Sequence, residues 1–261
     1  MDKPNIKIIF VDLDWTLFDH NILDYIPSGL DALARAREKG IKVIICTSRC
    51  YASLLRVDAF NKIPHDGYIC NNGGIAFTDN RYIYHHHLNK DLVKTLLNEF
   101  KERNYVAQIT CQRKAYLSKP EDDMSKIYYD NWLECRPTPK EYEDEEVTSM
   151  LLFLKEGDES FLSSYNVTIH RFFEFGIDIT PFPYLKKEGV EAVLNYYGYS
   201  KDNASAFGDD IADIDMFNAV TYSVAMGNGK PEAKEAAYMV TEPLYEDGLL
   251  KALIRLGVLD E

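Results

Sequence analysis

Two carboxylates near the start of the chain have the spacing of a paired catalytic site. Asp12 and Asp14 follow residues 6–11, an apolar run that is rich in β-branched residues and too short for a helix, so we expect a buried strand there. Because successive side chains of a strand point to opposite faces, a spacing of two places both carboxylates on one side. Open α/β sheets bind ligands at the carboxyl ends of their strands. We therefore predict that Asp12 and Asp14 form the centre of an active site.

Three further polar clusters stand at comparable places in the chain. They are Thr47-Ser48-Arg49 after the apolar run 41–46, Lys186 at the start of a helical stretch, and Asp209, Asp210 and Asp213 after the run 204–207. The carboxyl ends of neighbouring parallel strands meet at one edge of a sheet, so we expect these clusters to converge on Asp12 and Asp14. Carboxylates gathered in this way raise one another's pKa and oppose ionisation. A divalent cation would resolve the conflict, and ligands that are all oxygen favour Mg²⁺ over zinc.

The elements needed to position these residues alternate between strand and helix. Patterns of strand, helix, strand, helix and strand occupy residues 6–11, 27–39, 41–46, 51–60 and 68–70. The same rhythm returns after Lys186, with helices at 190–197, 231–237 and 249–256 and strands at 204–207, 222–225 and 238–240. This alternation predicts an α/β fold with a doubly wound, mainly parallel, Rossmann-like sheet.

The middle of the chain has a different pattern. A hairpin is predicted at 75–86, helices at 92–100 and 120–133, an exposed acidic connection at 141–146, and strands at 106–110, 115–118, 150–154, 167–173 and 176–180. We interpret residues 79–183 as an α+β domain inserted into a core that is formed by residues 1–78 and 184–261.

Composition limits the partners of this protein. Twenty-nine basic and 42 acidic residues give a net charge of 29 − 42 = −13, which repels nucleic acids and anionic membranes. No stretch approaches the ~20 apolar residues that span a bilayer, and no signal peptide precedes the first strand, so we expect a cytoplasmic protein. The five cysteines contain no CxxC pair, and we expect neither a disulfide framework nor a cysteine metal site. Our working expectation for the oligomeric state is a monomer.

The order and spacing of the clusters resemble the haloacid dehalogenase superfamily of phosphotransferases. The resemblance rests on the first motif, DxDxT at residues 12–16, the second-motif Thr47, the third-motif Lys186, and the fourth motif, GDxxxD at residues 208–213. Residues 72–74, Asn-Gly-Gly, and 225–228, Ala-Met-Gly-Asn, are similar to the Cof-like sugar phosphate phosphatases of that superfamily. In those proteins a large α/β cap lies between the second and third motifs, where this chain has residues 79–183.

The resemblance implies roles for the central residues of the site. Asp12 would be the nucleophile that forms an aspartyl phosphate, and Asp14 would be the general acid and base. Mg²⁺ would be held by the Asp12 carboxylate, the Asp14 backbone carbonyl and Asp209. Lys186 would bring positive charge to Asp12 and the transferring group, with Asp213 supporting it.

Phosphate contacts are expected from a second group of residues, namely Thr16, Thr47, Ser48, Arg49 and Asn72. Two of them have ordinary structural alternatives. Asn72 stands in an Asn-Gly-Gly sequence that is also plain turn chemistry, and Arg49 could equally pair with an acidic neighbour. Asn228 stands between two glycines and is interpreted as a turn residue. The sequence His85-His86-His87 places only two histidines on one face of a strand, which is too few for a metal site.

Two residues depart from the family pattern, and the third-motif lysine has to be chosen from two neighbouring lysines. Trp15 stands where relatives usually carry glycine, and Ala212 stands where they usually carry asparagine. Lys186 is preferred to its neighbour Lys187 because residues 186–190 fit the Lys-x-x-Gly-Ile pattern with Lys186 first.

The expected activity is Mg²⁺-dependent hydrolysis of a small phosphate monoester, with a sugar phosphate as the first choice. Two alternatives remain at this point. A phosphomutase would pass the phosphoryl group to a sugar hydroxyl instead of water. A receiver-like module would hold phosphate on an aspartate as a signal, although receivers are about half this length and have no use for an acid/base two residues further on.

Overall fold

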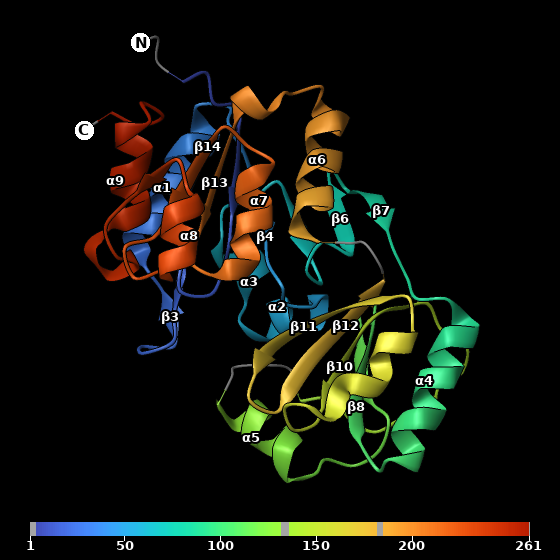
Figure 1. The fold of residues 1–261 in the computed structure, drawn as a ribbon. Helices are drawn as coiled ribbons and strands as arrows, with labels where there is room; N and C mark the ends of the chain where they lie inside the picture. Colours follow the sequence, from blue (N-terminus) through green and yellow to red (C-terminus); the bar gives the residue numbers. More distant parts are fainter. Residues whose placement is uncertain (1–3, 132–135, 182–184, 261) are drawn as a thin grey trace. The chain divides into compact units, whose positions relative to one another are not determined.

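The computed structural model describes residues 4–131, 136–181 and 185–260 (Figure 1). The chain divides into two compact units. Unit 1 consists of Met1–Ser48, Ala59–Tyr84 and Leu185–Glu261, and unit 2 consists of Arg49–Asp58 and His85–Tyr184.

Unit 1 is built on an eight-stranded sheet with the strand order β15-β14-β13-β1-β4-β5-β6-β7. Its strands are β1 (Ile8–Val11), β4 (Lys42–Cys46), β5 (Gly67–Cys70), β6 (Ile75–Thr78), β7 (Arg81–His85), β13 (Ala204–Gly208), β14 (Tyr222–Ala225) and β15 (Met239–Val240). From β15 to β5 the neighbours pair in parallel, and β6 then pairs antiparallel with β5. This arrangement confirms the predicted α/β class with a mainly parallel sheet.

Helices connect the parallel strands of unit 1. They are α1 (Pro27–Glu38), α3 (Ala59–Lys62), α6 (Lys186–Tyr197), α7 (Ile214–Asn218), α8 (Pro231–Ala236) and α9 (Gly248–Arg255), with the short 3-10 turns η2 (Lys201–Asn203), η3 (Ile211–Asp213) and η4 (Leu244–Glu246). Proline is the first residue of both α1 and α8, where its missing N–H costs no hydrogen bond.

Strand β1 lies inside this sheet, between β13 and β4. Its register aligns Val11 with Phe207 on one side and with Ile45 on the other, so the three strands end together. All four residues of β1 are buried, as expected for a parallel strand covered on both faces. The polar residues that follow these strands are thereby brought to one edge of the sheet.

A small hairpin follows β1 that the sequence pattern did not reveal. Strands β2 (Phe18–Asp19) and β3 (Asp24–Tyr25) pair antiparallel, and each contains only two residues. Strands this short carry no detectable alternation of polar and apolar residues, which is why the pattern missed them.

Unit 2 contains a five-stranded sheet with the order β11-β12-β10-β8-β9. Its elements are α2 (Tyr51–Arg56), α4 (Lys90–Glu102), β8 (Val106–Cys111), β9 (Ala115–Leu117), α5 (Asp123–Asn131), β10 (Val147–Phe153), η1 (Asp158–Ser164), β11 (Val167–Phe173) and β12 (Gly176–Pro181). Ala107 and Ile109 of β8 pack in a cluster with α4, whereas Val106 packs in another with α5. The alternation along β8 thus assigns the two helices to opposite faces.

The boundaries of the units differ from the expected domain limits in two places. Residues 79–84 belong to unit 1, because β7 continues the large sheet, and residues 49–58 belong to unit 2. The single helix expected at 51–60 is divided into α2 and α3 at Asp58, whose φ of 55° is incompatible with a continuing helix. Leu133, Cys135 and the predicted boundary between residues 183 and 184 lie outside the described residues.

The acidic connection at 141–146 is not uniformly exposed. Glu145 accepts hydrogen bonds from the Tyr116 hydroxyl at 3.1 Å and from the Glu143 backbone N–H at 2.9 Å, and it also pairs with Lys140. Its side chain is 16% exposed. The expectation of a wholly exposed connection was therefore wrong at this residue, because the carboxylate serves as a local hydrogen-bonding centre.

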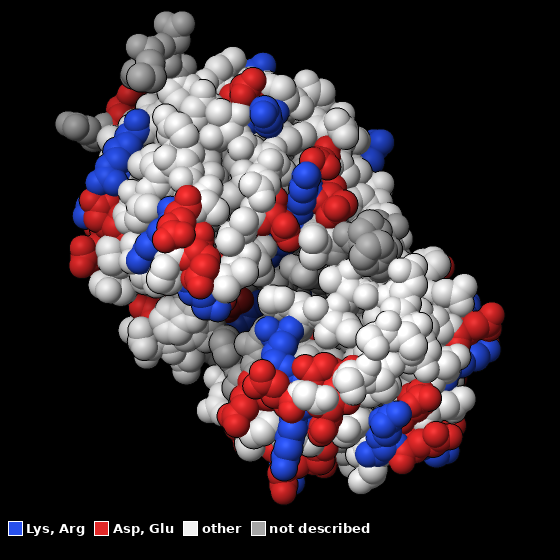
Figure 2. All heavy atoms as spheres, viewed as in Figure 1, with Lys and Arg blue, Asp and Glu red and all other residues white. Residues whose placement is uncertain are grey.

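The face of the molecule that Figure 2 shows carries charged side chains of both signs. On the face drawn in Figure 2, acidic and basic side chains lie among one another rather than gathering by sign. Within the described ranges, no helix has the length and apolar character needed to cross a bilayer.

Candidate active site

The predicted site begins at the residue that follows β1. The backbone N–H of Asp12 donates to the Phe207 carbonyl at 2.9 Å, which continues the pairing of β1 with β13 by one residue. The Asp12 side chain is buried, with 6% of the residue exposed. The end of the sheet thus fixes the backbone of the predicted nucleophile.

Lys186 lies between two of the predicted carboxylates. It is the first residue of α6, and its Nζ donates to Asp12 Oδ1 and to Asp213 Oδ1, at 2.7 Å each. Only 2% of Lys186 is exposed. Lys187, by contrast, has a side chain that is 43% exposed and pairs with Glu191 on the same helix. The choice of Lys186 over Lys187 thus agrees with where the two side chains lie.

Asp213 supports both Lys186 and the loop that carries Asp209. Its Oδ2 accepts the backbone N–H groups of Asp209 at 2.8 Å and Asp210 at 3.0 Å, while its Oδ1 accepts from Lys186. A Cβ on Gly208 would stand 2.4 Å from the Asp213 carboxyl carbon, so this approach requires glycine. In the GDxxxD motif, the first residue must therefore be glycine because a Cβ would not fit, and the last must be an aspartate because its carboxylate accepts the hydrogen bonds of the loop.

The charges of this cluster are not balanced within the protein. Burial raises the pKa of Asp12 to about 8, with Asp213 adding to the effect and Lys186 opposing it. Burial and the neighbouring Asp12 raise the pKa of Asp209 to about 9. Burial alone would lower the pKa of Lys186, but Asp12 and Asp213 outweigh it and raise that pKa. When all three carboxyl groups are ionised, the single ammonium group leaves two negative charges to be neutralised by protons or a cation.

The donor atoms fit a hard divalent cation. Asp12, Asp209 and Asp213 each offer a carboxylate oxygen, and these oxygens lie within 4.8 Å of one another. Asp213 is the least available of the three, because both of its oxygens already accept hydrogen bonds. Oxygen ligands of this kind suit Mg²⁺. The residues present are therefore compatible with the expected ion, with Asp12 and Asp209 as the better donors.

The turn after β1 carries Asp14, Trp15 and Thr16. Thr16 Oγ1 donates to Asp209 Oδ1 over 3.4 Å, which connects this turn to the fourth motif. Asp14 Oδ1 lies 2.7 Å from Nε2 of His20, a residue that the motifs did not single out. Trp15 has a φ of 58°, in the left-handed region that favours glycine, which explains why a glycine is usual at this position.

The remaining predicted residues lie in different units. Thr47 is buried in unit 1, and its carbonyl accepts the Asn72 backbone N–H at 3.3 Å. Ser48 donates to the Asn72 side-chain oxygen over 3.3 Å, so Thr47, Ser48 and Asn72 are joined. Arg49 belongs to unit 2, where it donates to Ser53 Oγ at 2.8 Å. The Ser53 hydroxyl is not the acidic partner of the structural alternative, so the role of Arg49 stays a prediction.

Two asparagines were not among the predicted site residues. Asn71 is 3% exposed, and among the described residues neither polar atom of its side chain has a hydrogen-bond partner, so a buried amide is left for a ligand or water. Asn228, expected to be only a turn residue, donates to the Trp15 carbonyl at 2.8 Å and accepts from the Leu244 backbone N–H at 2.8 Å. Both asparagines follow strands. From a single sequence, however, an asparagine in a glycine-containing turn cannot be distinguished from an ordinary turn residue.

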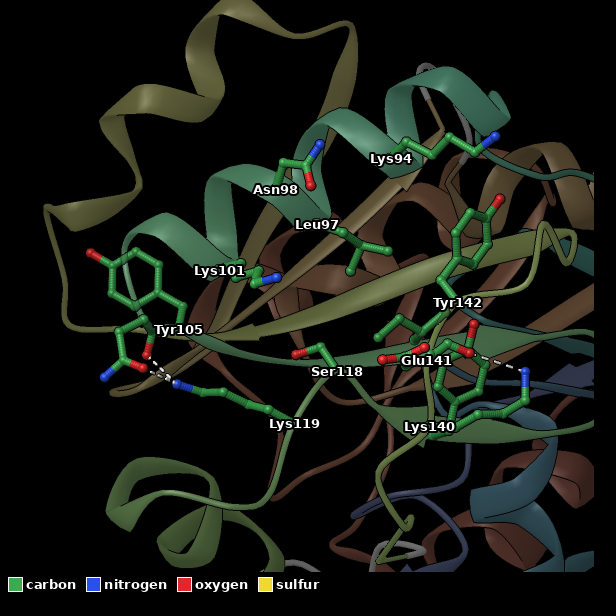
Figure 3. A pocket seen from close by; sticks show the side chains of 13 residues that line it. Lys94, Leu97, Asn98, Lys101, Tyr105, Ser118, Lys119, Lys140, Glu141 and Tyr142 are labelled. Carbon is green, nitrogen blue, oxygen red and sulfur yellow. Dashed lines mark hydrogen bonds between the residues drawn. The ribbon is translucent and has the colours of Figure 1, made fainter.

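A cavity of about 600 Å³ in unit 2 does not belong to this cluster (Figure 3). Four lysines line it: Lys94 and Lys101 from one face of α4, with Lys119 and Lys140 across from them. Lys94 pairs with Asp144 at 2.8 Å, Lys140 pairs with Glu145, and Lys119 donates to Asn104 at 2.6 Å. None of its described lining residues is a predicted site residue.

Comparison with known proteins identifies the relatives of this chain. Residues 9–253 match the family described as haloacid dehalogenase-like hydrolase. YkrA of Bacillus subtilis is 29% identical, with 97% of this chain and 98% of that protein covered. The 5-amino-6-(5-phospho-D-ribitylamino)uracil phosphatase YitU of the same organism is 28% identical over 94% of this chain and 96% of its own.

Solved structures extend the similarity to three dimensions. The subclass IIB sugar phosphatase BT4131 of the haloacid dehalogenase superfamily superposes with a TM-score of 0.84 at 29% identity. The match covers 97% of this chain and all of that chain.

Proposed function

Because this chain belongs to the haloacid dehalogenase-like hydrolases and is a phosphatase of that family, we propose that it hydrolyses small phosphate monoesters with the help of Mg²⁺. The proposed reaction passes through an aspartyl phosphate on Asp12, and the proposed substrate class is sugar phosphates. The observation that carries the mechanism is the position of Lys186 Nζ, at 2.7 Å from both Asp12 and Asp213.

Asp12 is the proposed nucleophile. One of its oxygens, Oδ1, accepts from Lys186, and no other hydrogen bond to its side chain occurs within the described residues, so Oδ2 is the proposed attacking atom. A bond forms between this oxygen and phosphorus while the ester P–O bond breaks. Lys186 stabilises the negative charge that the transferring group carries at that moment.

Asp14 is the proposed proton carrier. It gives a proton to the departing alkoxide, and it then takes a proton from the water that attacks the phosphorus of the aspartyl phosphate. As the water oxygen bonds to phosphorus, the bond between phosphorus and Asp12 Oδ2 breaks, inorganic phosphate leaves, and both aspartates return to their starting states. The Asp14 side chain is 26% exposed, so it can exchange protons with substrate and water.

Mg²⁺ would be held by Asp12, Asp209 and the Asp14 backbone carbonyl. When bound, the ion would supply positive charge that offsets the excess of carboxylates and screens the nucleophile from the phosphoryl oxygens. Asp213 keeps the Asp209 loop in place through its hydrogen bonds to the Asp209 and Asp210 N–H groups.

Phosphate contacts are assigned to Thr16, Thr47, Ser48 and Asn72, with Arg49 as a further candidate. Support comes from their placement: Thr16 contacts Asp209, while Thr47 and Ser48 both bond to Asn72. Hydroxyl and amide groups of this kind can donate to phosphate oxygens without adding charge.

Unit 2 is proposed to select the leaving group. Its sheet carries polar side chains at successive register positions, with Thr110 opposite Ser149 on β10, and Gln108 and Asp178 both opposite Leu151. Side chains that combine donors and acceptors are suited to a polyhydroxylated group. The similar structure of BT4131, which is a sugar phosphatase, supports the same substrate class. A panel of phosphorylated sugars, nucleotides and glycerol phosphate, assayed for phosphate release, tests this choice.

Replacing the nucleophile tests the proposed mechanism. Asp12→Asn should lower Mg²⁺-dependent hydrolysis of 4-nitrophenyl phosphate by at least about a thousandfold, because an amide oxygen is a poor nucleophile. Asp31→Asn, on the exposed face of α1, is the matched control and should keep full activity. Substantial Mg²⁺-dependent turnover by Asp12→Asn would contradict the mechanism.

A further inference from the structure

We propose that His20 is a positioning residue that holds the Asp14 carboxyl group in the orientation needed for proton transfer. This inference rests on the proposed role of Asp14 and adds to it a residue outside the four motifs. It is carried by the hydrogen bond between the two side chains and by the aromatic contacts that fix the imidazole ring.

The contact between His20 and Asp14 is short and sheltered. Nε2 of His20 lies 2.7 Å from Asp14 Oδ1, and the His20 side chain is only 9% exposed. With its proton on Nε2, the imidazole donates to the carboxylate. Fixing one oxygen in this way fixes the plane of the carboxyl group, and hence the direction along which it can pass a proton.

Two aromatic rings hold the imidazole in place. The Trp15 ring lies against it with a centroid distance of 5.1 Å and a tilt of 33°, and Phe18 meets it edge-on at 5.2 Å. Phe18 is buried and packs in turn against Tyr25 of β3 at 5.1 Å. The short hairpin after β1 therefore supplies a rigid support for His20.

Trp15 is an unexpected residue at this position, and its contact with His20 gives a reason for it. A φ of 58° is unfavourable for a tryptophan, and the turn is maintained by hydrogen bonds at both ends of the residue. The Trp15 N–H donates to the Phe18 carbonyl at 2.9 Å, and the Trp15 carbonyl accepts from Asn228 at 2.8 Å. A glycine here would relieve the backbone but would leave one side of the imidazole without its ring.

The test uses two esters that differ in how much they need a general acid. Phenolate is more basic than 4-nitrophenolate, so hydrolysis of phenyl phosphate depends more strongly on proton donation. In His20→Leu we expect kcat/KM for phenyl phosphate to fall at least about tenfold more than kcat/KM for 4-nitrophenyl phosphate. In His20→Gln, whose amide N–H can stand near the position of Nε2, this selective loss should largely disappear.

A second histidine of unit 1 provides the control for this experiment. His65→Leu removes a histidine of unit 1 that bonds to the Ile63 carbonyl and packs on Phe60, and it should lower both rates equally or not at all. Equal losses for the two esters in His20→Leu, or a selective loss that His20→Gln does not restore, would overturn the inference while leaving the proposed function intact. If Asp12→Asn retained turnover, the proposed function would fail first and this inference would fail with it.

Discussion

At the scale of single residues, one buried ammonium group organises the proposed catalytic cluster. Lys186 donates hydrogen bonds to two carboxylates, which stand 174 and 27 residues away in the chain. Breaking a buried ion pair by removing one partner is costly because the other charge remains buried. The neighbouring Lys187 forms only an exposed pair within α6, and such pairs contribute little.

This contrast predicts a large difference between two adjacent substitutions. Lys186→Met should lower the free energy of unfolding by about 3 kcal/mol in the absence of metal, because Asp12 and Asp213 lose their shared partner. Lys187→Met should change it by less than about 0.5 kcal/mol. Urea unfolding of both variants in the presence of a chelator measures the difference, and equal effects would show that the Lys186 pairs do not stabilise the fold.

At the scale of elements, the position of α6 depends on a close approach by the turn after β5. Gly73 has a φ of 96°, and a Cβ there would stand 2.1 Å from the Leu185 carbonyl oxygen, immediately before Lys186. Glu188 caps the start of α6 by accepting the Leu185 N–H at 2.8 Å. The turn and the cap together determine where Lys186 enters the site.

Gly73→Ala should therefore displace the start of α6 as well as strain the turn. We expect a loss of more than about 3 kcal/mol in stability, from left-handed strain and a backbone clash together, accompanied by reduced activity. Gly40→Ala is the matched control, because Gly40 has a similar φ of 81° but nothing within 4 Å of the position that a Cβ would occupy. It should cost only about 1–2 kcal/mol and leave kcat unchanged. Similar effects of the two substitutions on stability and kcat would refute the role given to this close approach.

At the scale of the whole molecule, each unit has its own core and its own electrostatic balance. Unit 1 buries a cluster of like charges that a cation can neutralise, whereas unit 2 pairs its half-buried Glu145 with Lys140 and Tyr116. Burial opposes ionisation of Glu145, but the hydrogen bonds outweigh it and lower its pKa to about 2. The pH dependence of the two units should therefore have different origins.

Glu145 should stabilise unit 2 at neutral pH and lose this effect in acid. Its folded pKa of about 2 lies below the unfolded value of 4.5, so the contribution is complete above about pH 4.5 and disappears as the pH falls towards 2. Glu145→Gln should lower the free energy of unfolding by about 1–2 kcal/mol at pH 7, and by less at pH 3. The exposed Glu141→Gln is the control. A Glu145→Gln effect that does not shrink in acid would contradict this assignment.

The sequence alone determined the parallel sheet and the residues at its edge. Apolar runs that end in carboxylates, hydroxyls or a lysine are local signals, and parallel strands must bring their carboxyl ends to one edge, so Asp12, Thr47 and Asp209 could be grouped before any coordinates. The resemblance to the haloacid dehalogenase motifs added the choice of Lys186 over Lys187 and the supporting role of Asp213.

Other features were decided only by tertiary structure. His20 follows a strand of only two residues, and Asn228 is held by a hydrogen bond to Trp15, 213 residues away, neither of which leaves a periodic pattern. The limits of the two units likewise depend on which sheet each strand joins, as β7 shows by continuing the large sheet. Local sequence fixes which groups are available for chemistry, whereas packing decides which of their neighbours hold them in position.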